Sequence, residues 1–146
     1  MTVITFRKTL SANDVGATGG HQGGVLIPKT NLELLAFLPE LEPTIKNPDA
    51  WIDCIDEISK PRRFRFVYYN NSLHGENGTR NEYRITYMTR YFRECGARTG
   101  DTFEISRGKG QVRYSIRVVK QQVVPPAKSE EDRVRIKISS TWQRVH

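Results

Sequence analysis

Two polar segments of the chain carry side chains suited to reading the edges of DNA bases. The first, residues 11–24, contains five glycines and almost no residue that a core would bury; the second covers residues 75–84. Polar, glycine-rich segments cannot form a core of their own, and glycine lets a backbone approach a ligand closely. Their side chains mix hydrogen-bond donors and acceptors, as base recognition requires. We therefore predict two arms that reach into double-stranded DNA, with candidate contacts at Asn13, Asp14, His21, Gln22, Arg80 and Glu82.

In the second segment, Arg80, Glu82 and Arg84 follow one another at every second position. On an extended arm this spacing points all three side chains in the same direction. An arginine can fork onto N7 and O6 of guanine, and a glutamate can accept from the amino group of cytosine. A carboxylate repels phosphate, so this mixed triplet favours base reading over phosphate binding. The alternative is an ion-pair ladder on a solvated strand, which has no recognition role.

In the first segment, Asn13 and Asp14 allow two interpretations. Both could form a local turn around Gly16, or Asp14 could accept from a cytosine amino group. His21 lies in a glycine-rich loop, where we expect it to donate to guanine or phosphate. Basic side chains beside the loop suit phosphate contact, which positions a protein without reading sequence. The remaining candidate contacts are Arg7, Lys8 and Ser11, together with Asn81 in the second segment.

The charge of the chain is positive and unevenly distributed. Of 146 residues, 23 are Lys or Arg and 16 are Asp or Glu, which gives a formal net charge of +7. Residues 1–59 hold four basic against eight acidic side chains, whereas residues 60–120 hold fourteen against five. This asymmetry indicates a polyanionic partner. A basic surface without a specific partner is the alternative.

The apolar pattern predicts a mainly β protein with one or two short helices. Apolar and polar residues alternate in short runs separated by turns, as in the strands of a barrel or sandwich. The aromatic side chains Phe64, Phe66, Tyr68 and Trp51 are expected in the core. We expect a single domain over residues 1–146, with a loop or linker at 125–132. The expected strands cover about residues 63–68, 83–87, 103–105, 112–118 and 134–138.

Three further segments concern helices. Thr30 and Glu33 have the spacing of a capping box, and leucines at helical spacing follow them. Residues 47–58 fit either a helix or a strand, and the β-rich surroundings favour a strand. Residues 90–95 are expected to form a short helical turn.

The sequence lacks the motifs of several classes of enzyme and metal-binding protein. The chain has no Asp/Glu-x-Lys sequence of the kind that Mg²⁺-dependent restriction nucleases use, since Glu57 and Lys60 are one residue too far apart. It has no metal-ligand spacing, phosphate-binding loop or nucleophile elbow. Cys54 and Cys95 are far apart and are expected to be reduced thiols. We therefore expect a cytoplasmic binding domain without catalysis, metal, cofactor or membrane partner, because no apolar signal or spanning segment opens the chain.

Two blocks of the sequence are similar to the N-terminal DNA-binding domain of the EcoRII restriction endonuclease family. The first, within residues 8–28, reads Leu-Ser-Ala-Asn-Asp-Val-Gly-Ala-Thr-Gly-Gly-His-Gln and then Ile-Pro. The second, within residues 67–86, reads Tyr-Tyr-Asn and then Thr-Arg-Asn-Glu-Tyr-Arg-Ile-Thr. The resemblance implies a DNA-binding pseudobarrel of the kind also found in plant transcription factors. It further implies an N-arm (about 7–24) and a C-arm (about 72–84) that grip the major groove of the site CCWGG, where W is A or T.

The resemblance also assigns roles to single residues and to the chain. Gly78 and Tyr83 stand where the EcoRII enzyme has lysines, so the contacts there must differ. The chain would be the recognition or effector domain of a type II restriction endonuclease, binding one site as a monomer, with the Mg²⁺-dependent nuclease domain absent from it. A pseudobarrel transcription regulator and a basic RNA-binding protein are the alternatives, although the deep major groove of duplex RNA is closed to side chains. The family contacts fall on Lys8, His21, Arg80, Glu82 and Arg84.

Overall fold

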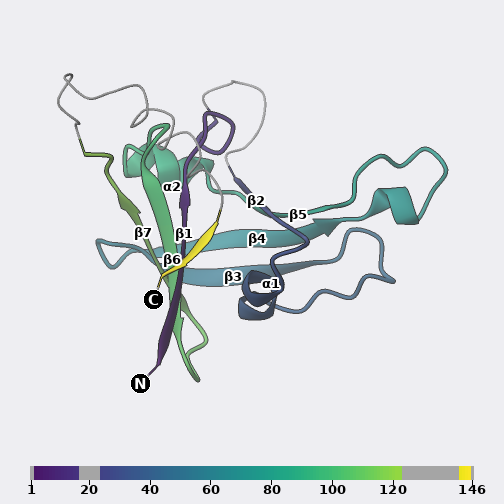
Figure 1. Cartoon of the computed structure of the whole chain (residues 1–146), viewed down its shortest axis with the longest axis horizontal. Coiled ribbons are helices and arrows are strands. Elements are labelled where there is room, and N and C mark those ends of the chain that lie inside the picture. The colour runs from purple at the N-terminus through teal and green to yellow at the C-terminus, as the bar shows by residue number, and fades with distance from the viewer. Residues whose placement is uncertain (1, 17–23, 123–141, 146) are drawn as a thin grey trace.

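The computed structural model describes residues 2–16, 24–122 and 142–145, and strands are the main regular structure of this part (Figure 1). Two short helices, α1 (Leu32–Phe37) and α2 (Thr89–Glu94), and a 3-10 turn, η1 (Asn71–Leu73), accompany the sheet. The predicted mainly β fold with short helices is confirmed. The strands are β1 (Val3–Thr9), β2 (Val25–Ile27), β3 (Asp49–Ile55), β4 (Pro61–Tyr69), β5 (Glu82–Thr86), β6 (Thr102–Gly108), β7 (Tyr114–Val119) and β8 (Gln143–Val145).

The strands of the described residues form one curled sheet in the order β2-β5-β4-β3-β7-β6-β1-β8. Two antiparallel groups of strands meet at β3 and β7, which pair in parallel at only two positions, Cys54 with Tyr114 and Ile55 with Ser115. The sheet edges β2 and β8 approach each other beside α1. There the indole N–H of Trp142 donates to the carbonyl of Leu26 over 2.9 Å. The sheet is therefore a curled, open half-barrel whose two edges are linked by this bond, in agreement with the predicted pseudobarrel.

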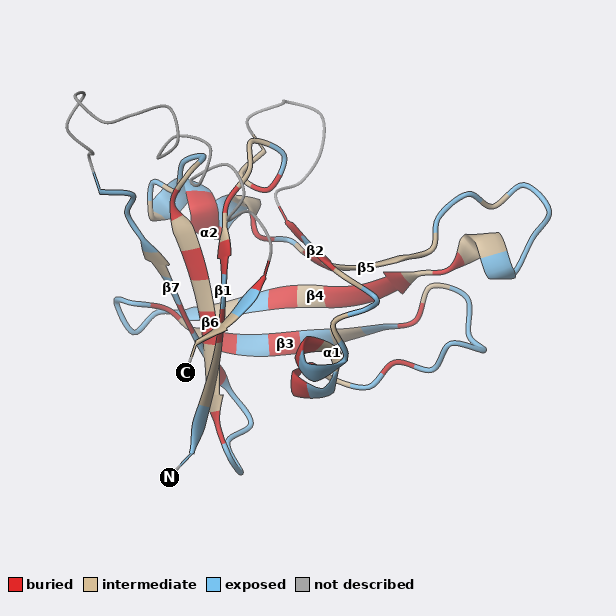
Figure 2. Ribbon diagram, viewed as in Figure 1, coloured by how far each residue is buried: buried red, intermediate tan, exposed pale blue. Residues whose placement is uncertain are grey.

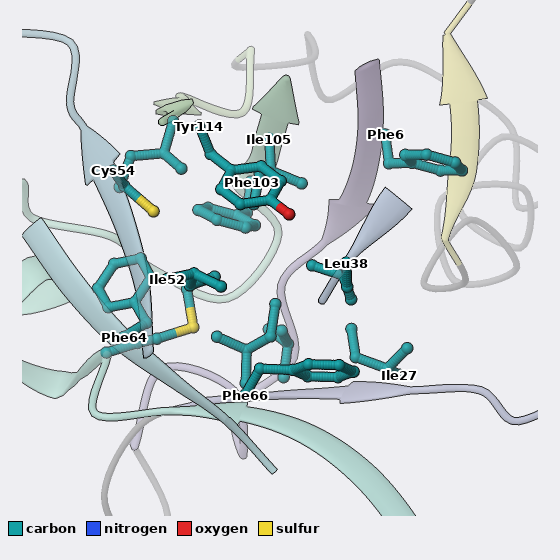
Figure 3. Packing of buried hydrophobic residues seen from close by; sticks show 14 of the residues in the cluster. Phe6, Ile27, Leu38, Ile52, Cys54, Phe64, Phe66, Phe103, Ile105 and Tyr114 are labelled. Carbon is teal, nitrogen blue, oxygen red and sulfur yellow. The ribbon is translucent and has the colours of Figure 1, made fainter. Parts of the chain in front are cut away.

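Apolar side chains from alternate strand positions fill the barrel. On β4, Phe64, Phe66 and Tyr68 are all buried, as predicted. They belong to the same cluster as Phe103 and Ile105 of β6 (Figure 3). Figure 2 shows that buried residues occupy the middle of β4 and β6, whereas most of the connection between β4 and β5 is exposed. The core thus lies between the two groups of strands and leaves the arms outside it.

Helix α1 closes one side of the core. Its buried Phe37 lies 5.1 Å from the ring of Phe6, measured between ring centroids, and 5.2 Å from the ring of Tyr114. The side chain of Asn31 accepts a hydrogen bond from the backbone N–H of Leu34 (3.1 Å) and caps the helix. The predicted cap, Thr30, is wrong by one residue, because the turn after β2 ends one position later than the capping-box spacing indicates.

Helix α2 confirms the predicted turn over residues 90–95. Gly96 follows it with φ +68, a conformation that favours glycine. The backbone N–H of Ala97 then donates to the carbonyl of Phe92 (2.8 Å), which completes a Schellman motif and ends the helix. No helix among the described residues is long and apolar enough to cross a membrane.

Three sequence expectations about strands need correction. Trp51 is 46% exposed rather than buried, because Ile52 takes the inward position on β3 and its neighbour must point outward. Tyr87 does not continue β5: it has φ 64, and its ring packs at a tilt against that of Trp51, with 5.4 Å between ring centroids. Val112 is 82% exposed, because the turn after β6 extends further than expected and β7 begins only at Tyr114.

Other expectations are confirmed or fall outside the described part. Residues 47–58 contain β3, so the preferred interpretation as a strand is correct. Cys54 and Cys95 are free cysteines, as predicted. The predicted loop at 125–132 and the predicted strand at 134–138 lie outside the described residues.

A buried ion pair fastens the β3–β4 turn to the barrel. Nε of Arg62 lies 2.9 Å from Oδ2 of Asp56, and the exposed fractions of these side chains are 8% and 1%. Arg62 also reaches Oε1 of Glu94 on α2 over 2.6 Å. Burial by itself would raise the pKa of Asp56, but hydrogen bonds from the Lys60 backbone, Arg62 and the Ile58 backbone outweigh it and hold that pKa below its ordinary value. The folded state therefore favours the ionised carboxylate.

We predict that Asp56→Ala lowers the free energy of unfolding by about 3 kcal/mol, because it leaves Arg62 buried with only Glu94 as counter-charge. Urea unfolding at pH 7 measures this effect. Asp53→Ala is the matched control, since its partner Arg63 is largely exposed at 3.5 Å, and it should cost less than about 1 kcal/mol. Equal losses in the two variants would contradict the prediction.

The same pair predicts a pH dependence. The pKa of Asp56 is lower in the folded than in the unfolded state, so its stabilising effect is complete above the unfolded pKa of about 4. It is lost as pH falls through the lower, folded-state pKa. The stability difference between wild type and Asp56→Ala should therefore shrink in urea titrations below about pH 4. A difference that stays constant down to acid unfolding would contradict this assignment.

Candidate nucleic-acid interface

The two predicted arms leave the barrel from different strands of the sheet. The N-arm connects β1 to β2, and the C-arm connects β4 to β5. β2 is an edge strand that pairs with β5, with Leu26 opposite Arg84. In Figure 1 the C-arm extends to the right of the barrel, and the described part of the N-arm rises above β1. Because β2 and β5 are antiparallel, the N-arm returns beside the end of β5, with Val25 opposite Ile85, whereas the C-arm returns at the start of β5.

The C-arm presents the predicted triplet as one connected group. Oε1 of Glu82 lies 2.8 Å from Nη2 of Arg80, and Oε2 lies 3.6 Å from Nη1 of Arg84. The side chains therefore share one side of the arm, as their spacing predicted. The alternative interpretation, an ion-pair ladder, also describes their arrangement in the free protein. All three side chains are between about a quarter and a half exposed, so the ladder is open to solvent.

An aromatic ring that the sequence interpretation missed supports this ladder. The guanidinium carbon of Arg80 lies 3.8 Å from the ring centroid of Tyr69. Tyr69 is the last residue of β4 and pairs in register with Glu82, so both side chains stand on the outer face. Stacking on an aromatic ring fixes the plane of a guanidinium group. The sequence did contain a signal for this ring: side chains alternate along β4, so Tyr69 must point outward if Tyr68 is buried.

The opposite side of the same strand faces the barrel. The carboxamide oxygen of Asn81 accepts a hydrogen bond from the hydroxyl of buried Tyr68 (2.6 Å). Tyr83 stacks almost flat on Tyr68, with 4.2 Å between ring centroids and 8° between ring planes. Burial and the neighbouring Tyr68 raise the pKa of Tyr83. The side chain at this position therefore serves packing as an aromatic ring.

The base of the C-arm is held by a pair of asparagines. The side-chain oxygen of Asn70 accepts from the backbone N–H of Asn47 (2.7 Å), and that of Asn47 accepts from the backbone N–H of Asn70 (3.1 Å). The amide nitrogen of Asn70, which is fully buried, also donates to the carbonyls of Pro43 and Ile45. These bonds satisfy the buried polar groups and attach the arm to the loop before β3.

Within the C-arm, the chain folds back on itself. The backbone N–H of Arg80 donates to the side chain of Asn71 (2.7 Å), and the N–H of Ser72 donates to the carbonyl of Arg80 (3.0 Å). Gly78 packs against this turn so closely that a Cβ would lie 2.0 Å from the carbonyl oxygen of Asn71. The observed arm conformation therefore leaves no room for a side chain at this position.

The base of the N-arm is also held by side chains. The ammonium group of Lys8 contacts Oδ2 of Asp14, and both side chains are at most 10% exposed. Oδ2 of Asp14 also accepts from the backbone N–H of Ser11 (2.9 Å), and the N–H of Asp14 donates to the hydroxyl of Ser11 (3.2 Å). The N–H of Gly16 bonds the carbonyl of Asn13 (3.1 Å). Asp14 thus forms the local turn that was one of its two interpretations.

The other predicted contacts in the N-arm differ in position. Arg7 is exposed on the outer face of β1, where its Nε lies 3.4 Å from Oε1 of Gln143. His21 and Gln22 lie outside the described residues. In the described part of the chain, no three His, Cys, Asp or Glu side chains come together as a metal site.

Comparisons with known proteins place these features in context. A family model described as "Restriction endonuclease EcoRII, N-terminal" matches residues 1–100. The type II restriction enzyme EcoRII of Escherichia coli is 42% identical over 91 residues, which cover 57% of this chain and 20% of that enzyme. The chain therefore spans about a fifth of the curated relative it matches. Among solved structures, an Arabidopsis FUS3–DNA complex has a TM-score of 0.60 at 22% identity and covers 82% of this chain and 99% of that chain. This likeness shows a shared pseudobarrel fold.

We predict that Gly78→Ala disrupts the C-arm, because its methyl group would meet the backbone of Asn71. Amide exchange at Ser72, whose N–H bonds the carbonyl of Arg80, should become faster, while the barrel amides stay protected. Gly75→Ala is the matched control, since a Cβ there has no neighbour within 4 Å. If Gly78→Ala leaves the exchange of Ser72 unchanged, the close packing of the arm is refuted.

Proposed function

We propose that this chain, which belongs to the EcoRII N-terminal family of restriction endonucleases, binds double-stranded DNA sequence-specifically. The proposed target is CCWGG, gripped in the major groove by the N-arm and the C-arm. In this proposal the domain is the recognition or effector part of a type II restriction endonuclease and binds one site as a monomer. It has no catalytic role, and Mg²⁺ serves a separate nuclease domain.

The observation that supports this proposal most directly is the ladder of Arg80, Glu82 and Arg84. A C·G pair offers a cytosine amino donor and two guanine acceptors in the major groove, which match one carboxylate and one guanidinium group. A solvent-exposed ion pair contributes about 0–1 kcal/mol. The arginines can therefore exchange a carboxylate oxygen for guanine N7 and O6 at little cost.

The scaffold supports the same function. Tyr69 holds the plane of the Arg80 guanidinium group. The reciprocal hydrogen bonds between Asn70 and Asn47 fix the point from which the C-arm leaves the barrel. Side chains held in advance lose less conformational entropy when they bind. A pre-ordered arm of this kind suits base reading, which needs hydrogen bonds in fixed directions, more than phosphate binding, which does not.

The first test is titration of the purified chain by fluorescence anisotropy with a CCWGG duplex and a scrambled duplex, each at two salt concentrations. We expect the CCWGG duplex to bind at least about a hundredfold more tightly at both salt concentrations. Equal binding of both duplexes, falling steeply with salt, would reduce the function to phosphate attraction. Preference for an RNA hairpin over either duplex would favour RNA binding instead.

We predict that Glu82→Ala relaxes base preference. Binding to CCWGG should weaken by about 1–3 kcal/mol, because the cytosine amino group loses its acceptor, while binding to the scrambled duplex stays nearly unchanged. Glu76→Ala removes the same charge from an exposed position of the same arm and should alter neither affinity. An equal change for both duplexes in Glu82→Ala would show that Glu82 does not read bases.

A further inference from the structure

Lys8 points into the protein rather than toward the interface. On β1, Phe6 is buried, and Lys8 lies two residues further along the same face. Arg7, between them, is exposed on the other face. Only 10% of the Lys8 side chain is exposed, so its ammonium group meets Asp14 instead of solvent. The resemblance to EcoRII expects a DNA contact at this position, whereas strand alternation assigns it to the interior.

Asp14 connects three segments at the base of the N-arm. Its carboxylate pairs with Lys8 of β1 and accepts from the N–H of Ser11 at the start of the arm. Its carbonyl accepts from the N–H of Gly24, directly before β2, over 3.0 Å. Gly24 in turn lies so close to β5 that a Cβ would be 2.4 Å from the carbonyl oxygen of Ile85. The two ends of the N-arm are therefore joined to each other and to the strand that follows the C-arm.

We propose that Lys8 and Asp14 form a clasp that positions the N-arm, and that they determine DNA specificity through the arm rather than by touching DNA. This inference rests on the proposed function. A buried ion pair is strongly unfavourable to open, because the remaining carboxylate would be buried without its counter-charge. Lys8 consequently stays on Asp14 in the complex, and the ends of the arm keep the separation that the Asp14–Gly24 hydrogen bond sets.

A DNA contact by Lys8 and a positioning role of Lys8 would affect DNA binding in different, measurable ways. A lysine that neutralises a phosphate contributes to all duplexes alike, and its removal lowers the slope of log K against log salt concentration by about one. A lysine that only positions the arm contributes to the specific complex and leaves the slope unchanged. The affinity ratio between CCWGG and scrambled duplexes and the salt slope therefore separate contact from positioning.

The experiment compares Lys8→Met, Asp14→Asn and the double variant K8M/D14N with wild type. The double variant removes both charges, so it leaves no uncompensated buried charge and serves if Lys8→Met fails to fold. Lys109→Met is the matched control, because Lys109 is exposed beyond β6, opposite the start of β1 and away from the N-arm. Each variant is titrated with both duplexes at several salt concentrations, and thermal melting verifies that it is folded.

We expect K8M/D14N to lose at least about tenfold in affinity for CCWGG, with the scrambled duplex and the salt slope unchanged. The loss of CCWGG affinity in K8M/D14N should not exceed the loss in Lys8→Met, since each substitution opens the same clasp. Lys109→Met should match wild type. Equal weakening on both duplexes with a slope lower by about one would overturn the proposal and make Lys8 a phosphate contact.

Amide exchange without DNA provides a readout that does not depend on the proposed function. Opening the clasp should speed the exchange of Gly24 and Ser11, whose N–H groups both bond Asp14. Wild-type exchange at Gly24 in K8M/D14N would overturn the clasp whatever the DNA data show. If wild type itself shows no preference for CCWGG, the proposed function fails, and the exchange result alone decides whether the clasp exists.

Discussion

The alternation of side chains along the strands determines what each residue of this protein can do. The strands of the barrel have one face against the core, so the side chains of neighbouring residues point to opposite faces of the sheet. Tyr68 packs inside while Tyr69 stands outside beneath Arg80. Lys8 is enclosed while Arg7 is exposed. A shift of register by one residue would exchange these roles, and the buried apolar rows on β4 and β6 make such a shift prohibitive.

The arms need a second kind of stabilising contact, because they extend beyond the apolar core that orders the strands. Each arm is attached at its base by buried polar groups rather than by apolar packing. Asn70 and Asn47 bond each other's backbone at the C-arm, and Asp14 joins Lys8 to the backbone of the N-arm. Buried polar groups are costly unless they are satisfied, so such contacts tolerate little variation in geometry. The arms therefore leave the barrel in defined directions.

Ion pairs have different roles at different depths in this molecule. The exposed ladder of the C-arm is weakly held, which leaves its arginines and glutamate free to exchange partners. The buried pairs, Asp56 with Arg62 and Asp14 with Lys8, connect strands and turns, and their side chains are almost closed to solvent. Burial thus separates charges that can act in recognition from charges that hold the scaffold together.

The sequence by itself determined the features that depend on near neighbours. The mainly β fold, the position of α2, the strand over residues 47–58 and the common direction of Arg80, Glu82 and Arg84 all follow from local periodicity, and the structure confirms them. The tertiary structure decided which face of each strand meets the core. It turned Trp51 outward, buried Lys8 against Asp14 and left Gly78 no room for a side chain. These outcomes depend on strands and loops that are distant in sequence, and no local pattern specifies a distant partner.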